Sequence, residues 1–378
     1  MPQLQDLDLS QAVGYHYDQF PPTNIDALRL VKPISAAAAA LARYDQMLKG
    51  MHNSEILLAP LRNQEAVVSS RMEGTISTLD EVLRYEADKE ERDGADDHRY
   101  RSEAIEVYLY SRALTAAQHS LEEGAPLSSH LIRSAHRMLL SFGRGAAANP
   151  GSFKTEQNYL ADRGRRQVLF VPIKPEFLID GLERLFSFID DEKSEILIRT
   201  ALAHLEFEAL HPFKDGNGRI GRMLITLMLW KYGAISAPHF YISGYFDDRK
   251  DEYIDGMRDV SARGAWTDWI IFFLEAIENQ ANKNLAQAES IRQLYEEMKE
   301  VFRELLSSQW STAALDFLFS RPIFRNNVFT GKSNIPPQTA HRFTRVLAEK
   351  GLIQTLEDAS GRRPALYSFE PLLRLVRG

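Results

Sequence analysis

Apolar residues recur every three or four positions over long stretches of this chain, which is the spacing of amphipathic helices. Two such stretches flank a polar segment near the middle of the sequence. The upstream stretch, 194–210, carries its apolar residues at Ile196, Ile198, Ala201, Leu202, Leu205 and Leu210. The downstream stretch carries Ile220, Met223, Leu224, Leu227 and Met228, and Gly233 follows as a helix stop. The pattern predicts two helices joined by the polar loop 211–218.

Further helices are predicted on either side of this pair. Ser35 is expected to cap a helix that starts with the alanine run 36–40 and continues to Met47. The charged run 86–101 is expected to be a solvated loop or a helix end. A short β-prone run bounded by breakers predicts a strand at 168–172. Periodic segments place other helices over 103–114, 128–140, 176–190, 242–265, 266–278 and 279–306.

The pattern changes from residue 310 onward. Two short helices are predicted near 314–319 and 328, and a third over 337–350, where Gly351 is a C-cap. The runs 352–356 and 365–369 predict a β-hairpin, so residues 310–378 resemble a winged helix-turn-helix domain. This segment has ten Lys and Arg against five Asp and Glu, whereas the chain as a whole has a net charge of −7. That asymmetry makes DNA a candidate partner, although winged helices also serve as interaction or dimer modules.

The chemistry of the chain is concentrated in the polar loop and the start of the helix after it. Gly216 and Gly218 permit a close backbone approach and positive φ, which Asn217 also tolerates. A glycine-rich loop that leads into a helix N-terminus presents main-chain N–H groups and a positive dipole end, and both favour a phosphate. Arg219 and Arg222 lie three residues apart and share one helix face, so both can bind phosphate oxygens.

Two other side chains complete this set. Asp215 is a hard oxygen ligand for a Mg²⁺ ion that bridges phosphates. His211, directly before the loop, can accept a proton near neutral pH. Together the residues predict a nucleoside triphosphate, magnesium and a histidine general base.

Residues 211–222 read H-P-F-K-D-G-N-G-R-I-G-R and match the H-x-F-x-D-G-N-G-R-x-x-R motif of the Fic (Fido) family, which the chain therefore resembles. The resemblance implies transfer of AMP from ATP to a Tyr, Thr or Ser hydroxyl of a protein, and the chain itself is a candidate target. His211 would be the base and Asp215 the magnesium ligand. The nucleotide would be held by Asp215, Gly216, Asn217, Gly218, Arg219, Ile220, Gly221 and Arg222.

The resemblance also assigns residues outside the motif. Ser69, Glu73 and Gly74 match the S-x-x-x-E-G inhibitory signature of the family, within a helix expected at about 62–74. Glu73 would pair with Arg222 and so exclude or misplace the γ-phosphate. Tyr253 would lie near the adenine. The residues Gln167, Val168, Leu169 and Phe170 would form a β-hairpin flap that aligns a target segment by strand-like pairing.

These observations predict a mainly α-helical chain: a Fic-type helical bundle with a short β-hairpin flap, N-terminal helices and a C-terminal winged helix. The expected domains are an N-terminal helical region at 1–110, a catalytic core at 111–285, a linker helix at 286–309 and the winged helix at 310–378. There are no cysteines, no N-terminal signal pattern and no run of about 18 apolar residues. We therefore expect a cytoplasmic protein without a membrane partner, and a homodimer is compatible with the family.

Several alternatives stay open. The same site could remove AMP, because Glu73 could position a water, or it could use another nucleotide donor. A DNA-binding regulator would use the winged helix and sense nucleotide through the core. A metal-dependent hydrolase could be built from His204, Glu208 and His211, because His204 and Glu208 are four residues apart on one helix.

Overall fold

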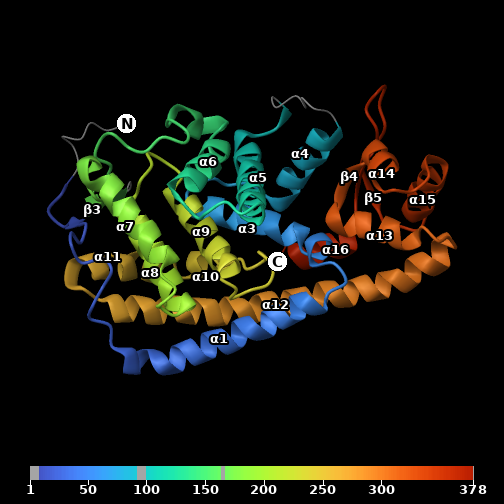
Figure 1. The fold of residues 1–378 in the computed structure, drawn as a ribbon. Helices are drawn as coiled ribbons and strands as arrows, with labels where there is room; N and C mark the ends of the chain where they lie inside the picture. Colours follow the sequence, from blue (N-terminus) through green and yellow to red (C-terminus); the bar gives the residue numbers. More distant parts are fainter. Residues whose placement is uncertain (1–7, 92–98, 163–166, 378) are drawn as a thin grey trace. The chain divides into compact units, whose positions relative to one another are not determined.

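The computed structural model describes residues 8–91, 99–162 and 167–377. Helices predominate, which confirms the predicted mainly α-helical fold (Figure 1). The chain forms two compact units, each made of two separate stretches: Met1–Arg43 with Arg112–Asn282, and Tyr44–Ser111 with Lys283–Gly378. Three helices pass from one unit to the other: α1 (Ala27–Gly50), α5 (Ser102–Glu122) and α12 (Trp266–Leu306).

The first unit is built around two central helices, α8 (Ile196–Leu210) and α9 (Asn217–Lys231). Nearly every residue of both is buried, as expected for helices that have neighbours on all sides. In this unit α7 packs beside α8 (Figure 1), and the Trp269 indole N–H of α12 donates to the Ala201 carbonyl at 2.8 Å. The other helices of the unit are α6 (Ser129–Leu139), α7 (Leu178–Asp190), α10 (Ser243–Asp248), α11 (Lys250–Arg263) and the 3₁₀ turns Gly143–Ala147 and Pro175–Phe177.

A small sheet of order β1-β3-β2 also belongs to the first unit. β3 (Gln167–Val171) is central; it pairs antiparallel with β2 (Leu160–Asp162) and parallel with β1 (Val13–Gly14). The residues after β1 anchor it to α8, because the Tyr15 hydroxyl and the His16 Nε2–H group donate to the two oxygens of buried Glu206 at 2.6 and 2.9 Å.

The second unit contains the helices α2 (Ser54–Leu57), α3 (Ala59–Met72) and α4 (Leu79–Glu91) and all elements after α12. These last elements are α13 (Ser311–Ser320), β4 (Ile323–Arg325), α14 (Asn326–Lys332), α15 (Pro337–Glu349), β5 (Gln354–Glu357), β6 (Leu366–Ser368) and α16 (Glu370–Val376). The strands form an antiparallel sheet of order β4-β6-β5. The three helices and the hairpin lie where the spacing predicted them, whereas β4 and α16 were not predicted.

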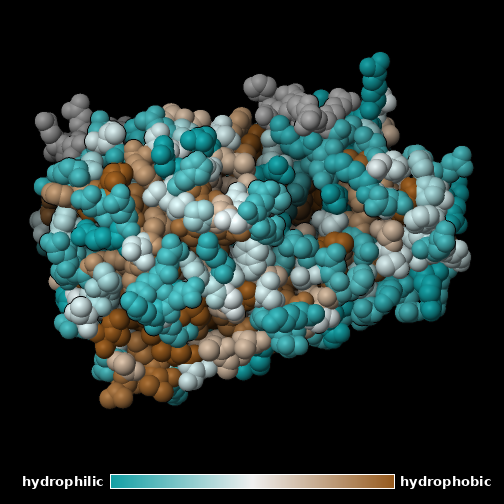
Figure 2. Space-filling view, in the orientation of Figure 1, coloured by the Kyte–Doolittle hydropathy of each residue, from teal (hydrophilic) through white to brown (hydrophobic). Residues whose placement is uncertain are grey.

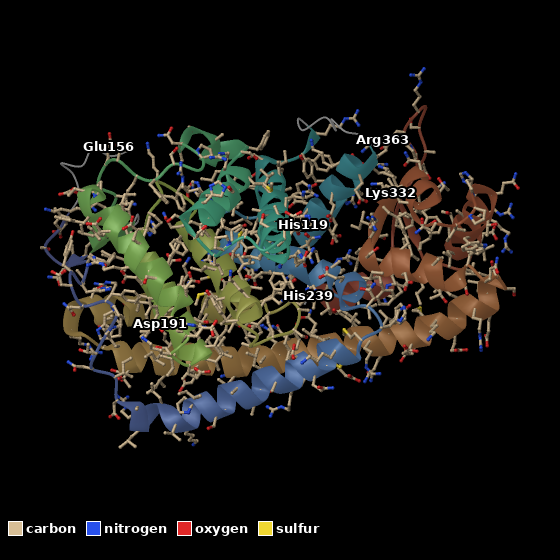
Figure 3. The ribbon with its side chains drawn as sticks, viewed as in Figure 1. His119, Glu156, Asp191, His239, Lys332 and Arg363 are labelled. Atoms are coloured by element: carbon tan, nitrogen blue, oxygen red, sulfur yellow. The ribbon has the colours of Figure 1, made fainter. Side chains whose placement is uncertain are left out.

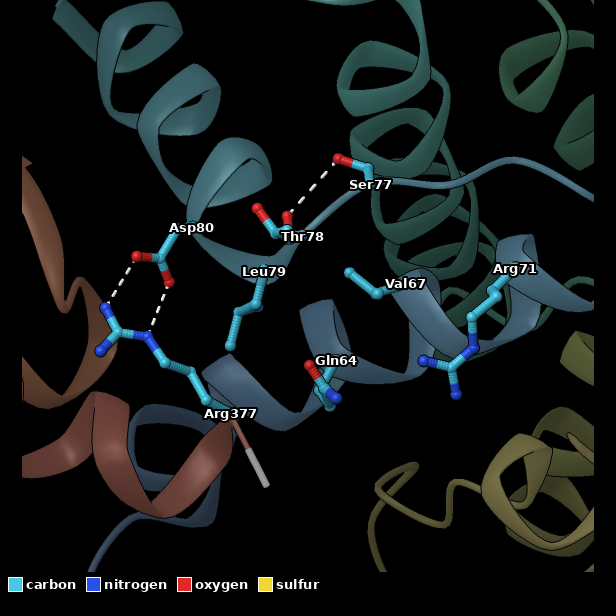
Figure 4. A pocket seen from close by; sticks show the side chains of 8 residues that line it. All are labelled: Gln64, Val67, Arg71, Ser77, Thr78, Leu79, Asp80 and Arg377. Atoms are coloured by element: carbon cyan, nitrogen blue, oxygen red, sulfur yellow. Dashed lines mark hydrogen bonds and ion pairs between the residues drawn. The ribbon is translucent and has the colours of Figure 1, made fainter. Parts of the chain in front are cut away.

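Four arginines of residues 310–378 bind carboxylates of α4. Arg325 is fully buried and donates to Asp88 at 2.7 Å, and Arg363 donates to the same carboxylate at 2.9 Å. The other two pairs are Arg321 with Glu90 and Arg377 with Asp80. Figure 4 shows the two parallel bonds from Arg377 to Asp80 at the edge of a pocket of about 450 Å³, lined also by Gln64, Val67, Arg71, Ser77, Thr78 and Leu79.

Two sequence expectations about these elements were wrong, and a third was right only in part. α1 begins at Ala27 and runs through Pro33, so Ser35 is not a cap; its hydroxyl donates to the Val31 carbonyl inside the helix. The segments 266–278 and 279–306 form one helix, α12, rather than two. The run 86–101 contains the end of α4 at Glu91, as one of its two predicted forms required, but Asp88 within it is 8% exposed and binds two arginines; residues 92–98 lie outside the described residues.

Two further observations concern the surface. Figure 2 shows an apolar area over the N-terminal end of α1, where Leu28 and Val31 are 87% and 61% exposed. Within the described ranges, no helix has both the length and the apolar character needed to cross a membrane.

Candidate active site

The polar loop between α8 and α9 is bounded by two residues in the left-handed conformation. His211 ends α8 with φ 46° and ψ 61°, and its main-chain N–H donates to the Phe207 carbonyl at 3.0 Å. Gly216 precedes α9 with φ 79°. Only glycine adopts such angles without cost, so the loop depends on Gly216, and His211 must be held in place by its surroundings.

The side chain of Asn217 closes the loop. Its Oδ1 accepts from the Phe213 main-chain N–H and its Nδ2 donates to the Phe213 carbonyl, both at 2.8 Å. The carboxylate of Asp215 accepts from the Gly216 main-chain N–H at 2.7 Å. The amide of Asn217 thus braces the loop, and the first turn of α9 offers a ligand its main-chain N–H groups.

Arg219 places a positive charge below the loop. It is 2% exposed, and its Nη2 lies 3.6 Å from Oδ1 of Asp215. Its Nε and Nη1 are buried and have no hydrogen-bond partner among the residues that the structure describes. Buried donors without partners are rare and costly, so this guanidinium suits an anion that approaches the N-terminus of α9.

The remaining motif residues fix the helix behind the loop. Arg222 is also buried, at 2% exposure, and Ile220 packs into the apolar interior. Gly221 lies so close to α8 that a Cβ atom there would collide with the carboxylate of Glu208. Residues 217–222 thus form the first turns of a helix that packs closely on α8.

The imidazole of His211 is half-buried, and its Nδ1 lies 3.4 Å from the Glu208 carbonyl. With the proton on Nδ1 directed at that carbonyl, Nε2 is the nitrogen that can accept a proton. Asp215 is the carboxylate of the loop, and its side chain is 50% exposed. The described residues contain no group of three His, Asp or Glu placed to hold a metal, so Asp215 would hold Mg²⁺ together with ligand phosphates and water.

The flap residues Gln167, Val168, Leu169 and Phe170 all lie in β3. Val168 and Phe170 are buried, whereas Gln167 and Leu169 are half-buried on the other face. Both edges of β3 already have partners: β2 on one side, and β1 with Asp8 on the other, where the Val168 main-chain N–H donates to the Asp8 carbonyl at 2.8 Å.

Tyr253 is buried at 4% exposure, stacks on Phe246 with centroids 4.5 Å apart and bonds to Nε2 of His204 at 2.8 Å. The other nitrogen of His204, Nδ1, lies 3.1 Å from the Gly221 carbonyl, so both ring nitrogens are engaged. Burial, with the charge of Arg222, lowers the pKa of His204 to about 3. These contacts give His204 a structural role beneath α9 and do not favour the metal-hydrolase alternative.

Ser69, Glu73 and Gly74 belong to the second compact unit. Ser69 is fully buried in α3, Glu73 is the exposed C-cap of that helix, and Gly74 has φ 82°. The main-chain N–H of Thr75 reaches back to the Ser70 carbonyl at 3.0 Å, which stops the helix sharply.

Three residues that contact the loop were missed from the sequence. Lys154 and Asn158 donate to its main-chain carbonyls, and His136 bonds to the Asp215 carbonyl at 2.9 Å. His136 lies in the helix predicted over 128–140, and Lys154 and Asn158 lie between the predicted elements. No periodic pattern marks such residues, because polar contacts between segments 50 to 80 residues apart leave no local spacing.

Comparison with known proteins places this geometry in a family. A model described as the Fic/DOC family N-terminal region matches residues 31–119, and the Fic/DOC family model itself matches residues 126–229, which together are about half of the chain. The chain belongs to the Fic/DOC family. The second match includes the loop and most of α9, so the predicted family is confirmed.

Several proteins with sequences similar to this Fic/DOC chain carry the names of nucleotidyl transferases. "Protein adenylyltransferase fic-1" of Caenorhabditis elegans is 32% identical over 105 residues, which are 27% of this chain and 19% of that protein. "Probable protein adenylyltransferase aq_aa38" of Aquifex aeolicus is 27% identical over 35% of this chain and 44% of its own length. "Uridine 5'-monophosphate transferase" of Xanthomonas campestris is 28% identical over 31% of this chain and 23% of its own length. The matches thus span less than half of each relative.

A solved structure supports the fold. The crystal structure of a Fic family protein from Desulfovibrio desulfuricans has a TM-score of 0.57 with 18% identity, over 92% of this chain and 98% of that one. At this identity the likeness concerns the arrangement of helices alone.

Proposed function

We propose that this chain transfers AMP from ATP to a hydroxyl group of a protein, with Mg²⁺ bound at Asp215. The observation that carries the proposal is Arg219, a buried guanidinium with two unsatisfied nitrogens in the described structure, beneath a loop that opens a helix N-terminus. A polyphosphate would satisfy these donors and the main-chain N–H groups of α9 together. The names of the C. elegans and A. aeolicus relatives support AMP as the transferred group.

In the proposed reaction His211 accepts the proton from a Tyr, Thr or Ser hydroxyl, and the oxygen of that hydroxyl attacks the α-phosphorus. The bond from the α-phosphorus to its bridging oxygen breaks, and pyrophosphate leaves. Arg219 and Arg222 stabilise the charge on the β- and γ-phosphates, and the main-chain N–H groups of Gly218 and its neighbours face the developing charge. Bound Mg²⁺ would offset negative charge on the leaving pyrophosphate.

We propose that Glu73 opposes Arg222 and keeps the enzyme largely inactive. The support is local: Glu73 stands at the end of a helix that Gly74 terminates sharply, so its carboxylate is presented from a rigid element. A carboxylate bound to Arg222 would compete with the γ-phosphate.

A target strand would pair with the outer edge of β2. Within the described residues β2 pairs only with β3, whereas β3 is paired on both edges. Main-chain pairing is therefore open at Leu160–Asp162, and the residues Gln167–Phe170 support that edge as the central strand.

Incorporation of labelled AMP from α-labelled ATP and Mg²⁺ tests the proposal. The samples are the wild type, Glu73→Gly and Glu73→Gly with His211→Ala, each with and without a cell lysate as target source. We expect strong labelling only with Glu73→Gly, and labelling of the chain without lysate would identify it as its own target. No labelling in any sample would overturn AMP transfer. The same assay with α-labelled UTP addresses the donor suggested by the X. campestris relative, and release of AMP from a labelled protein addresses removal.

A further inference from the structure

Four consecutive carbonyl groups, from the last residue of α8 to the third residue of the loop, accept hydrogen bonds from one short segment, residues 154–158. Asn158 Nδ2 donates to the carbonyls of His211 and Phe213, both at 3.1 Å. Lys154 Nζ donates to the Leu210 carbonyl at 3.0 Å, and its main-chain N–H donates to the Pro212 carbonyl at 2.8 Å. The segment thus donates a hydrogen bond to every main-chain carbonyl from residue 210 to residue 213, which is the turn that contains His211.

Lys154 and Asn158 also hold each other. The ammonium of Lys154 donates to Oδ1 of Asn158 at 2.8 Å, which orients the amide so that its Nδ2 faces the loop. Lys154 is 8% exposed, and burial lowers its pKa to about 7. Among the described residues its side-chain acceptors are the amide oxygen of Asn158 and the Leu210 carbonyl, both neutral, and burying an ammonium among neutral acceptors costs free energy.

This segment leads directly into the flap. β2 begins two residues after Asn158, and Gln157 Nε2 donates to the carbonyls of Asn158 and Pro172, both at 3.0 Å. Pro172 follows the end of β3. The two ends of the flap and the turn at His211 are therefore joined by one hydrogen-bonded network.

We propose that Lys154 and Asn158 are positioning residues for His211, and that they couple the docking of a target on the flap to the placement of this base. The inference rests on the proposed role of His211. His211 adopts a left-handed conformation that is strained for any residue other than glycine. The donors of Lys154 and Asn158 satisfy the main-chain carbonyls on both sides of it. A target strand that moves β2 would move Asn158, and the imidazole with it.

The test replaces Asn158 by Asp in the Glu73→Gly background. Asn158→Asp keeps the size of the side chain but replaces the two N–H donors by a carboxylate that faces two carbonyls. Lys154→Met is a second variant that removes the ammonium and keeps the length of the side chain. The matched control is Glu156→Gln, on the same segment, where the side chain is exposed (Figure 3).

Two readouts are needed: kcat and KM for ATP in AMP transfer, and amide hydrogen exchange of the peptide that covers residues 207–217. With Asn158→Asp we expect kcat to fall by about 100-fold, because a displaced base loses most of its effect, while KM for ATP changes by less than about threefold. Exchange of the loop should accelerate. Glu156→Gln should match its parent in both readouts.

The outcomes separate the two proposals. Unchanged kcat and exchange in Asn158→Asp, with an active parent, would overturn the positioning role alone. An equal loss of kcat and of ATP binding would show a general structural effect and would also overturn it. No transfer by the Glu73→Gly parent would overturn the proposed function, and with it the role of the segment in positioning a base, whereas the exchange data would still show whether Asn158 holds the turn.

Discussion

The imidazole of His136 lies parallel to the ring of Phe213, with the centroids 3.8 Å apart and an angle of 8° between the planes. Its Nδ1 accepts from the Gly151 main-chain N–H at 2.8 Å, and its Nε2–H donates to the Asp215 carbonyl at 2.9 Å. Only a neutral imidazole can accept at one nitrogen and donate at the other. His136 therefore supports the loop in one protonation state.

The two hydrogen bonds of neutral His136 predict that the free energy of unfolding falls at acid pH. Burial lowers the pKa of His136 to about 4, whereas an unfolded histidine titrates near 6.5. The unfolded chain therefore binds a proton first as pH falls, so stability is full above about pH 6.5 and declines towards pH 4. The expected loss between pH 7.5 and 4.5 is about 2 to 3 kcal/mol from this group. Urea unfolding at several pH values in that range gives the free energy of unfolding as a function of pH. This free energy should fall less steeply with decreasing pH in His136→Gln than in the wild type. An equal dependence on pH in both proteins would contradict the role of His136.

Tyr253→Phe should destabilise the first unit by about 1 kcal/mol, because it removes the hydroxyl partner of His204 Nε2 inside the core. Denaturant unfolding measures this loss. If the Tyr253 ring also contacts adenine, Tyr253→Phe should leave KM for ATP unchanged, and Tyr253→Leu should raise it. If Tyr253→Phe and Tyr253→Leu both have the KM for ATP of the wild type, the Tyr253 ring does not contact the nucleotide.

Gly221→Ala should lower the free energy of unfolding by about 1 to 3 kcal/mol, since the added methyl group collides with the Glu208 carboxylate across the α8–α9 contact. Gly50→Ala is the control, because nothing lies within 4 Å of a Cβ there and its φ is not in the left-handed range. Thermal unfolding of the two variants should differ clearly. A Gly221→Ala protein as stable as the control would mean that the Glu208 carboxylate moves aside at little cost.

Arg325→Met should destabilise the second unit by about 3 kcal/mol, because it removes the fully buried cation between Asp88 and Glu357 and leaves them only the half-buried Arg363. Arg345→Met is the surface comparison: Arg345 is 72% exposed and pairs with Glu349 at 3.8 Å, so its loss should cost less than about 1 kcal/mol. Chemical unfolding that showed equal effects would contradict the burial of Arg325.

The sequence predicted the helices and the loop because both depend on local signals: apolar spacing, glycines and the residues of one contiguous motif. It failed where exposure to solvent or a contact between distant segments outweighs a local rule. Pro33 removes one helical N–H, yet α1 continues through it because the carbonyl left without that donor, on Arg29, belongs to an exposed residue. The supports of the loop, Lys154, Asn158 and His136, come from segments that have no sequence relation to it.

The pairing of α4 with residues 310–378 changes how the basic charge of that segment should be understood. Four of its ten cations, Arg321, Arg325, Arg363 and Arg377, are bound to Glu90, Asp88 and Asp80. In a fragment that begins at residue 310, these four arginines would lose their partners on α4, so the net charge of the fragment would overstate the charge that the segment presents in the intact chain. The carboxylates of α4 are the built-in counter-ions of this basic segment.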